Sequence, residues 1–270
     1  MTGRRIATIL RQEADSTEQV MIRKWLWIPV LAWSISAGAA DGTRLSLGLY
    51  ASSGDYGTPG TTEIQMLSLG LKHQQGPWTL KLTLPWLRID GSSNVLPDGT
   101  TTGGSTASRR REGMGDVTVS VGRRLFYDRQ RRLGASLRAK VKLPSADADR
   151  ALGTGEPDYT LELAPFGLLG RTTLFGALGY RWYGDTAATD YRDVWLARLG
   201  FSHPISATQS LGLSAGFRQA NRAGRDDRRS LTLFHGWKPA PHWKLQSYLI
   251  KGFSDATADI AGGVNLSRTF

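Results

Sequence analysis

Apolar and polar residues alternate along a stretch in the middle of the chain. From Leu133 to Pro144, leucine, alanine and valine take every second position, and the positions between them are polar and mostly basic: Ser136, Arg138, Lys140 and Lys142. Side chains of a β-strand point alternately to its two faces, so this strand would be apolar on one face and cationic on the other. Such a strand suits a half-buried soluble sheet or the wall of a transmembrane barrel, where lipid contacts one face and water the other.

The same alternation returns through the rest of the chain. It predicts eleven further strands, at about residues 43–51, 62–73, 78–86, 116–122, 159–164, 172–183, 195–201, 211–218, 231–237, 243–253 and 260–270. Short turns alternate with mostly longer polar loops, one of them expected at residues 90–113. This asymmetry is typical of short periplasmic turns and longer outer loops. We therefore predict an all-β fold, a transmembrane antiparallel up-and-down β-barrel of about twelve strands.

Six tryptophans divide between the two ends of the predicted barrel. Three flank short turns and three flank the other connections, respectively Trp78, Trp237 and Trp243, and Trp86, Trp182 and Trp195. Trp78 and Trp86 are eight residues apart in one strand, which is roughly 27 Å of extended chain. Aromatic residues gather at both membrane interfaces of outer-membrane barrels, whereas a soluble sandwich has no reason to sort them. We expect these six residues to be membrane-interface anchors.

The first forty residues predict an export signal. Arg23 and Lys24 precede an apolar run from Trp25 to Ile35, and small residues follow up to Ala40. The run is too short to span about 30 Å of hydrocarbon, which favours a secretory signal peptide over a membrane anchor. We assign this signal to residues 21–40, removed on export.

Residues 1–20 are polar and precede a second methionine, so we interpret them as an upstream extension and expect translation to start at Met21. The barrel would then comprise residues 41–270, in the outer membrane of a Gram-negative bacterium. The chain ends on Phe270. A terminal aromatic residue resembles the signal that the barrel-assembly machinery recognises in the last strand.

Composition narrows the partners. The chain has 270 residues, a formal net charge of +11 and no cysteine, which excludes disulfides, thiolate metal sites and a cysteine nucleophile. A positive balance often indicates nucleic acid or anionic membranes. The sequence shows no basic helix, zinc motif or aromatic RNA-binding motif, so we expect no nucleic acid partner. We expect outer-membrane lipids, lipopolysaccharide and a small-molecule solute as partners, and no metal or cofactor.

Three ordered segments resemble the motifs of a known family. Residues 113–117 read Gly-Met-Gly-Asp-Val, residues 142–147 read Lys-Leu-Pro-Ser-Ala-Asp, and residues 152–159 read Leu-Gly-Thr-Gly-Glu-Pro-Asp-Tyr. They are similar to the outer-membrane family labelled MetA-pathway of phenol degradation, which usually has threonine and glycine where this chain has Ser145 and Ala146. The resemblance implies a transport-like barrel tied to uptake of aromatic or other small organic compounds. A Gly-rich phosphate cradle is the competing interpretation, but no Gly-Lys-Ser/Thr follows.

The lumen-facing positions are mostly basic. By strand parity they include Arg44, Lys81, Asp116, Arg138, Lys140, Lys142, Glu162, Arg181, Arg198 and Arg218. Three consecutive inward cations on one strand repel each other and need water, acidic partners such as Asp116 and Glu162, or a bound anion. Two interpretations stay open: a constriction that favours anions, or a charge network that only braces the lumen. We therefore predict a channel or transport-like barrel for small organic, aromatic or anionic solutes.

Two other functions deserve comparison. A lipid-acting hydrolase needs a serine, a histidine base and an orienting group, but the four histidines lie towards the turn ends of predicted strands and outside any recognised serine motif: His73, His203, His235 and His242. We therefore expect no enzyme activity. A surface-interaction barrel could bind lipopolysaccharide phosphates or an acidic partner through Arg109–Arg111 and Arg222–Arg229, although solvated loop charge explains the same residues.

Overall fold

The regular elements of the chain are all β-strands in the computed structural model, which describes residues 42–101, 107–186 and 189–270. The export signal expected at residues 21–40 and the extension before it lie outside the described residues. The strands are β1 (Gly42–Gly54), β2 (Thr62–Gln75), β3 (Trp78–Ser92), β4 (Ser108–Met114), β5 (Thr118–Asp128), β6 (Leu133–Lys142), β7 (Asp158–Leu169), β8 (Thr172–Trp182), β9 (Val194–Pro204), β10 (Gln209–Arg218), β11 (Arg228–Trp237), β12 (Trp243–Gly252) and β13 (Ile260–Thr269). Within the described ranges, no helix has the length and apolarity needed to cross a membrane.

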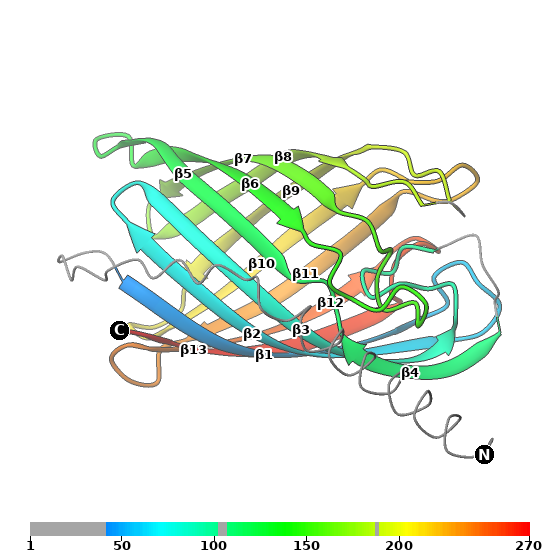
Figure 1. Cartoon of the computed structure of the whole chain (residues 1–270). Helices are drawn as coiled ribbons and strands as arrows, with labels where there is room; N and C mark the ends of the chain where they lie inside the picture. Colours follow the sequence, from blue (N-terminus) through cyan, green and yellow to red (C-terminus); the bar gives the residue numbers. More distant parts are fainter. Residues whose placement is uncertain (1–41, 102–106, 187–188) are drawn as a thin grey trace, which may run out of the picture. The chain divides into compact units, whose positions relative to one another are not determined.

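The strands close into one antiparallel barrel. Neighbours in sequence pair with each other except β4 and β5, and β1 closes the ring by pairing with β13. The first half of β3, residues 78–83, pairs with β5, and its second half, residues 86–92, pairs with β4. Strands β4 and β5 therefore share one position in the wall. The wall therefore has twelve positions, and the predicted twelve-stranded barrel is confirmed. Short turns and the carboxyl terminus lie at one end, and the longer connections lie at the other (Figure 1).

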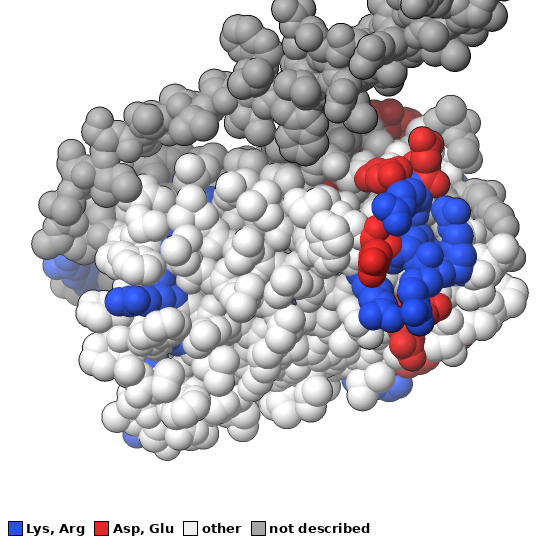
Figure 2. Space-filling view, turned by 60° about the horizontal axis from the view of Figure 1, so that its bottom comes forward, with Lys and Arg blue, Asp and Glu red and all other residues white. Residues whose placement is uncertain are grey.

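The two faces of the wall follow the sequence alternation. In β1, Leu45, Leu47 and Leu49 are exposed on the outer face, while Arg44 and Ser46 take the inward positions. On the side that Figure 2 shows, charged residues gather towards the two ends of the barrel, and a broad band without them lies between. An apolar belt around a closed antiparallel barrel is the architecture of bacterial outer-membrane proteins. The predicted outer-membrane location is confirmed.

The loop expected at residues 90–113 is wrong at its two ends, because β3 extends to Ser92 and β4 begins at Ser108. The seven residues of β4 pair with the second half of β3. Arg109–Arg111 therefore lie in a strand. On the outer face, Asp90 Oδ2 forms an ion pair with Arg110 Nη2 at 2.8 Å. Charged pairs of this kind are stable at the loop end of the wall because that end lies outside the hydrocarbon, where the apolar alternation is not required.

The six tryptophans all lie on the outer face, three towards each end of the barrel, with exposed fractions from 36% for Trp243 to 49% for Trp78. Trp243 also lies beneath the guanidinium of Arg268, 5.5 Å from the ring centroid. Their anchoring role stays a prediction. Phe270 is exposed beside the same guanidinium, and its backbone N–H donates to Thr43 O at 2.8 Å. Its role in assembly also stays a prediction.

A hydrophobic cluster fills part of the lumen at the loop end. It combines inward residues of β2 and β3 with residues of loops 55–61, 93–101 and 143–157: Ile64, Leu87, Ile89, Tyr56, Val95, Ala146 and Leu152. Val95 and Leu152 are almost completely buried. The described parts of these outer loops therefore fold into the barrel and narrow it, which the alternation pattern did not predict.

Candidate functional site

A cavity of about 610 Å³ occupies the lumen next to the inward-folded loops. One part of its wall is mostly apolar and comes from β1, β2, β3, β12 and β13, with Tyr50, Met66, Pro85, Leu87, Ile250 and Ala261. The other part is charged and comes from β6 to β10, with Lys140, Lys142, Glu162, Arg181, Arg198 and Arg218. The cavity therefore offers both an apolar surface and cations to the same molecule.

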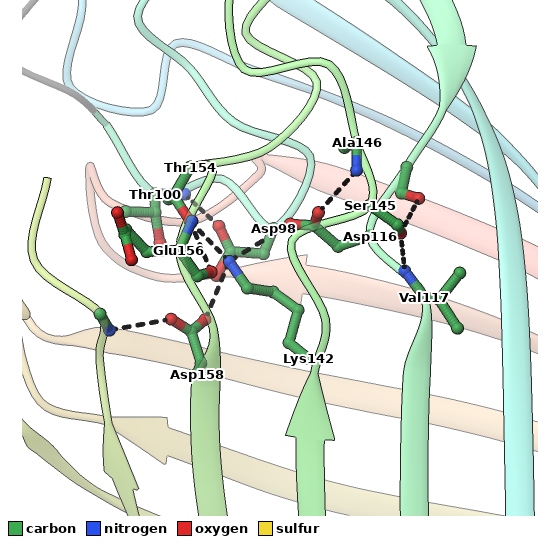
Figure 3. Close-up of polar contacts among 12 residues, drawn as sticks. Asp98, Thr100, Asp116, Val117, Lys142, Ser145, Ala146, Thr154, Glu156 and Asp158 are labelled. Carbon is green, nitrogen blue, oxygen red and sulfur yellow. Dashed lines mark hydrogen bonds and ion pairs between the residues drawn. The ribbon is translucent and has the colours of Figure 1, made fainter. Parts of the chain in front are cut away.

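Lys142 is the centre of a charge network at the loop end of β6. Its ammonium lies 3.2 Å from Asp116 Oδ2 and 3.3 Å from Asp158 Oδ2, and it donates to Thr154 Oγ1 at 2.8 Å (Figure 3). Asp116 Oδ1 also accepts a hydrogen bond from the backbone N–H of Ala146 at 3.0 Å. The network joins residues from all three motif segments, so these segments meet in space and fix loop 143–157 to the lumen wall.

Two small residues in the motif segments allow this close packing. Ser145 Oγ accepts from the Val117 backbone N–H at 2.8 Å and donates to Gly115 O at 3.3 Å. A Cβ at Gly153 would lie 2.7 Å from Asp116 Oδ2 and 2.8 Å from the Ala146 Cβ, closer than real contacts. The Ser145 hydroxyl therefore links the segments around Gly115 and Val117, and Gly153 leaves room for the carboxylate.

The three cations expected to form a ladder on β6 have different surroundings. Arg138 Nη1 lies 2.6 Å from Glu162 Oε1, and Lys142 is held by the network above. No acidic side chain of the described residues lies within ion-pair distance of Lys140. Arg198, on β9, also lines the cavity without an ion pair among the described residues. Arg138 and Lys142 are therefore neutralised by acidic neighbours, whereas Lys140 has no such partner among the described residues.

Asp98 connects an inward-folded loop to the far wall. Residues 95–101 form a tight turn closed by a bridge between Val95 and Thr101. At its tip, Asp98 Oδ2 lies 3.1 Å from Arg218 Nη1 and 3.7 Å from Arg181 Nη1, and Arg228 donates to its backbone carbonyl. The loop thus reaches strands β8, β10 and β11. No feature of the alternation pattern singles out this aspartate.

The arginines around Asp98 set its protonation. Partial loss of water inside the lumen would raise the pKa of the carboxyl, but Arg218, Arg228 and Arg181 outweigh this effect and hold the pKa well below its usual range. A lowered pKa stabilises the bound loop above the ordinary carboxyl pKa of about 3.9. That stabilisation is lost only as pH falls through the lowered pKa.

We therefore expect the contact of Asp98 with the arginines to persist from pH 7 to pH 4. Single-channel conductance should show no step in this interval that depends on Asp98. The control is Asp98→Asn, recorded over the same pH series. A rise in conductance between pH 6 and pH 4 in the parent protein that the variant lacks would contradict the expectation.

Most of the arginines expected on the surface hold the loops together. Arg111 is 3% exposed and donates to Ser92 O at 3.1 Å, to Val95 O, and to Ala151 O at 3.3 Å. Arg222 donates to Thr101 O at 3.1 Å. These guanidiniums therefore serve the inward folding of the loops, and Arg110 is the one of them that pairs on the outer face of the described wall.

Inward cations also follow one line of strand pairing. Residues that face each other on neighbouring strands form a continuous row, here called the basic row: Arg44, Lys72, Lys81, Ser120, Lys140, Thr160 and Arg181. Like charges directly opposite each other destabilise a sheet, as do Arg44, Lys72 and Lys81 here. Lys72 was absent from the expected lumen set, although its parity with Ser68 and Gly70 in β2 would have found it.

The described residues contain no group of three or more histidine, cysteine, aspartate or glutamate side chains arranged to hold a metal ion. Carboxylates in the lumen are instead paired with lysine or arginine.

Comparison with known proteins decides the family. The family model described as "Putative MetA-pathway of phenol degradation" matches residues 59–270. The chain belongs to this family. The match covers β2 to β13 and includes the three motif segments that meet around Lys142. No curated protein sequence matches the chain.

Solved structures share the fold at low sequence identity. The COG4313 outer membrane channel from Pseudomonas putida F1 is 15% identical, with a TM-score of 0.69, over 90% of this chain and 99% of the channel. The NanC porin is 9% identical, with a TM-score of 0.55, over 84% and 98%. The translocator domain of autotransporter NalP from Neisseria meningitidis is 14% identical, with a TM-score of 0.51, over 98% of both chains. These similarities concern the fold alone, because barrels of different roles share it.

Proposed function

We propose that this protein is an outer-membrane channel for small organic anions, with aromatic acids as the favoured class. The observation that carries the proposal is the cavity in the lumen, where an apolar wall faces a cationic one. Six cations and four acidic residues line it. A small aromatic acid is complementary to these two walls, because it has an apolar body and one negative charge.

The basic row supports the proposed preference for anions. It begins at Arg44 near the short-turn end and reaches Arg181 beside Asp98. A ladder of lysine and arginine lowers the barrier for anions and raises it for cations. The phenol-degradation label of the family and the channel and porin names of two structural neighbours agree with passage of small organic molecules.

Reversal potentials in a salt gradient across planar bilayers test the proposal. We expect anion preference in the parent protein and a several-fold lower anion-to-cation permeability ratio in Lys72→Gln/Lys81→Gln/Lys140→Gln, because each charge within about 4 Å of a passing ion contributes roughly 1 kcal/mol even in water. Lys251→Gln is the matched control, since this lysine faces outward opposite Ile260. A cation-selective or non-conducting parent protein would contradict the proposal.

A lipid-acting hydrolase receives less support. His73 Nδ1 lies 3.0 Å from Thr43 Oγ1, His203 Nδ1 lies 2.9 Å from Thr172 Oγ1, and His235 Nε2 lies 3.1 Å from Gln209 Oε1. These partners are threonine and glutamine side chains towards the short-turn end, away from the lumen cavity. None of the described contacts places a serine hydroxyl against a histidine base.

A surface-interaction barrel is also less well supported, because Arg111 and Arg222 donate to loop carbonyls inside the protein. The proposal includes three further roles. Residues 21–40 direct export, the six tryptophans anchor the barrel at the membrane interfaces, and Phe270 is recognised during assembly. Lipopolysaccharide and outer-membrane lipids surround the wall, and the solute occupies the lumen.

A further inference from the structure

Three buried polar atoms on the cavity wall have no hydrogen-bond partner within the described part of the chain. They are Thr160 Oγ1, Arg181 Nε and Arg218 Nε, and all three residues line the same cavity. Buried polar groups in proteins are nearly always paired, and leaving one unpaired is costly. A group of such donors on one wall therefore indicates a ligand that accepts hydrogen bonds.

Lys140 lies beside these three residues, so four side chains with polar groups are neighbours on the cavity wall. Lys140 faces Thr160 across β6 and β7, and Thr160 faces Arg181 across β7 and β8. Arg218 reaches the same place from β10, because both arginines contact Oδ2 of Asp98. The side chains of Arg181 and Arg218 are only 16% and 13% exposed, so a ligand reaches them through the lumen.

Each of the two guanidiniums keeps its Nε without a partner among the described residues. Nη1 of Arg181 contacts Asp98 and donates to the Tyr183 hydroxyl at 3.2 Å, while its Nε has no partner. Nη1 of Arg218 contacts Asp98 and its Nη2 donates to Thr100 Oγ1 at 3.5 Å, while its Nε is likewise without a partner. Arginine recognises a carboxylate best by two parallel N–H donors. The two free Nε–H groups are suited to a second acidic group.

We propose that Lys140, Thr160, Arg181 and Arg218 bind the carboxylate of the transported solute, and that Asp98 is a built-in competitor for the same arginines. This inference rests on the proposed function and assigns its acid-binding site. The Asp98 side chain is 43% exposed, so an incoming acid can approach and replace it. Its carboxylate already shows that the site accepts this chemical group.

Calorimetric titration of the refolded protein with benzoate tests the competition. We expect Asp98→Asn to bind benzoate about tenfold more tightly than the parent protein, because a charged competitor becomes a neutral one. Asp90→Asn is the matched control, since Asp90 forms a similar ion pair with Arg110 on the outer face. Neutral benzyl alcohol should bind equally weakly to all three proteins. Equal benzoate affinity in Asp98→Asn and the parent, or an equal gain for benzyl alcohol, would overturn the inference.

A second variant keeps the test valid if Asp98→Asn does not fold. Lys140→Gln leaves every described ion pair intact, and we expect it to weaken benzoate binding about fivefold through loss of one charged donor. Unchanged affinity would contradict the inference. Calorimetry requires no ion flow, so an anion-selective channel without an effect of Asp98 refutes this inference alone. Benzoate binding by the site in a cation-selective channel refutes the proposed function alone.

Discussion

Replacing Lys142 with methionine is expected to lower the free energy of unfolding by about 3 kcal/mol, because the change removes the shared partner of two acidic side chains. Asp116 and Asp158 are only 10% and 8% exposed, and Lys142 is 20% exposed. Loss of the ammonium leaves two carboxylates close together without a counter-charge. Urea unfolding of the refolded protein in lipid vesicles, followed by tryptophan fluorescence, measures the loss.

The control for this prediction is Lys81→Met, because Lys81 faces inward opposite Lys72 and Ser120 and forms no ion pair among the described residues. It should cost far less than the change at Lys142. Replacing both aspartates by asparagine together with Lys142→Met should recover part of the stability, since neutral side chains no longer need the cation. Equal losses in Lys142→Met and Lys81→Met would show that the network contributes nothing to stability.

A charge in the middle of the apolar belt is expected to lower the stability of the folded barrel strongly. Leu199 lies midway along β9 and is 71% exposed on the outer face. We expect Leu199→Arg to destabilise the folded barrel by roughly 2–4 kcal/mol, the cost of arginine at the centre of a bilayer. The same unfolding measurement in vesicles reports the change.

Ile205 provides the matched control, because it is also exposed, at 57%, but lies in the turn after β9. Ile205→Arg should cost only about 0–1 kcal/mol, since the penalty falls towards the interface. At urea concentrations that unfold both variants, their tryptophan fluorescence should be the same, because neither chain then places the arginine in lipid. Similar stabilities for the two folded variants in vesicles would mean that Leu199 does not face the hydrocarbon.

The sequence predicted the wall well because lipid imposes a strict physical rule on it. Every second residue must be apolar where the wall meets hydrocarbon, as Leu45, Leu47 and Leu49 show in β1. Parity alone also identified Asp116 and Lys142 as inward residues, and these two side chains form an ion pair. Wherever one face of a strand contacts lipid, reading alternate positions is enough to assign the other face.

The parts that escaped prediction lie where that rule no longer acts. In β4, Arg110 and Glu112 face outward beyond the hydrocarbon, so the segment shows no apolar alternation and resembles a loop. Asp98 meets Arg218 and Arg228 from more than a hundred residues away. Its sequence, Pro-Asp-Gly, is that of any exposed turn. Only the folded barrel brings the aspartate to the arginines.

The basic row has a geometric consequence for a solute. Six steps between neighbouring strands separate Arg44 from Arg181, and each step is about 4.8 Å, so the row spans about 29 Å around the wall. Because the strands are tilted, an ion that follows these residues rotates about the barrel axis while it moves from one mouth to the other. A solute whose charged end followed the row would therefore turn its apolar body as it moved, and at Arg181 it would share the cavity with Tyr50 and Met66, which face each other on β1 and β2.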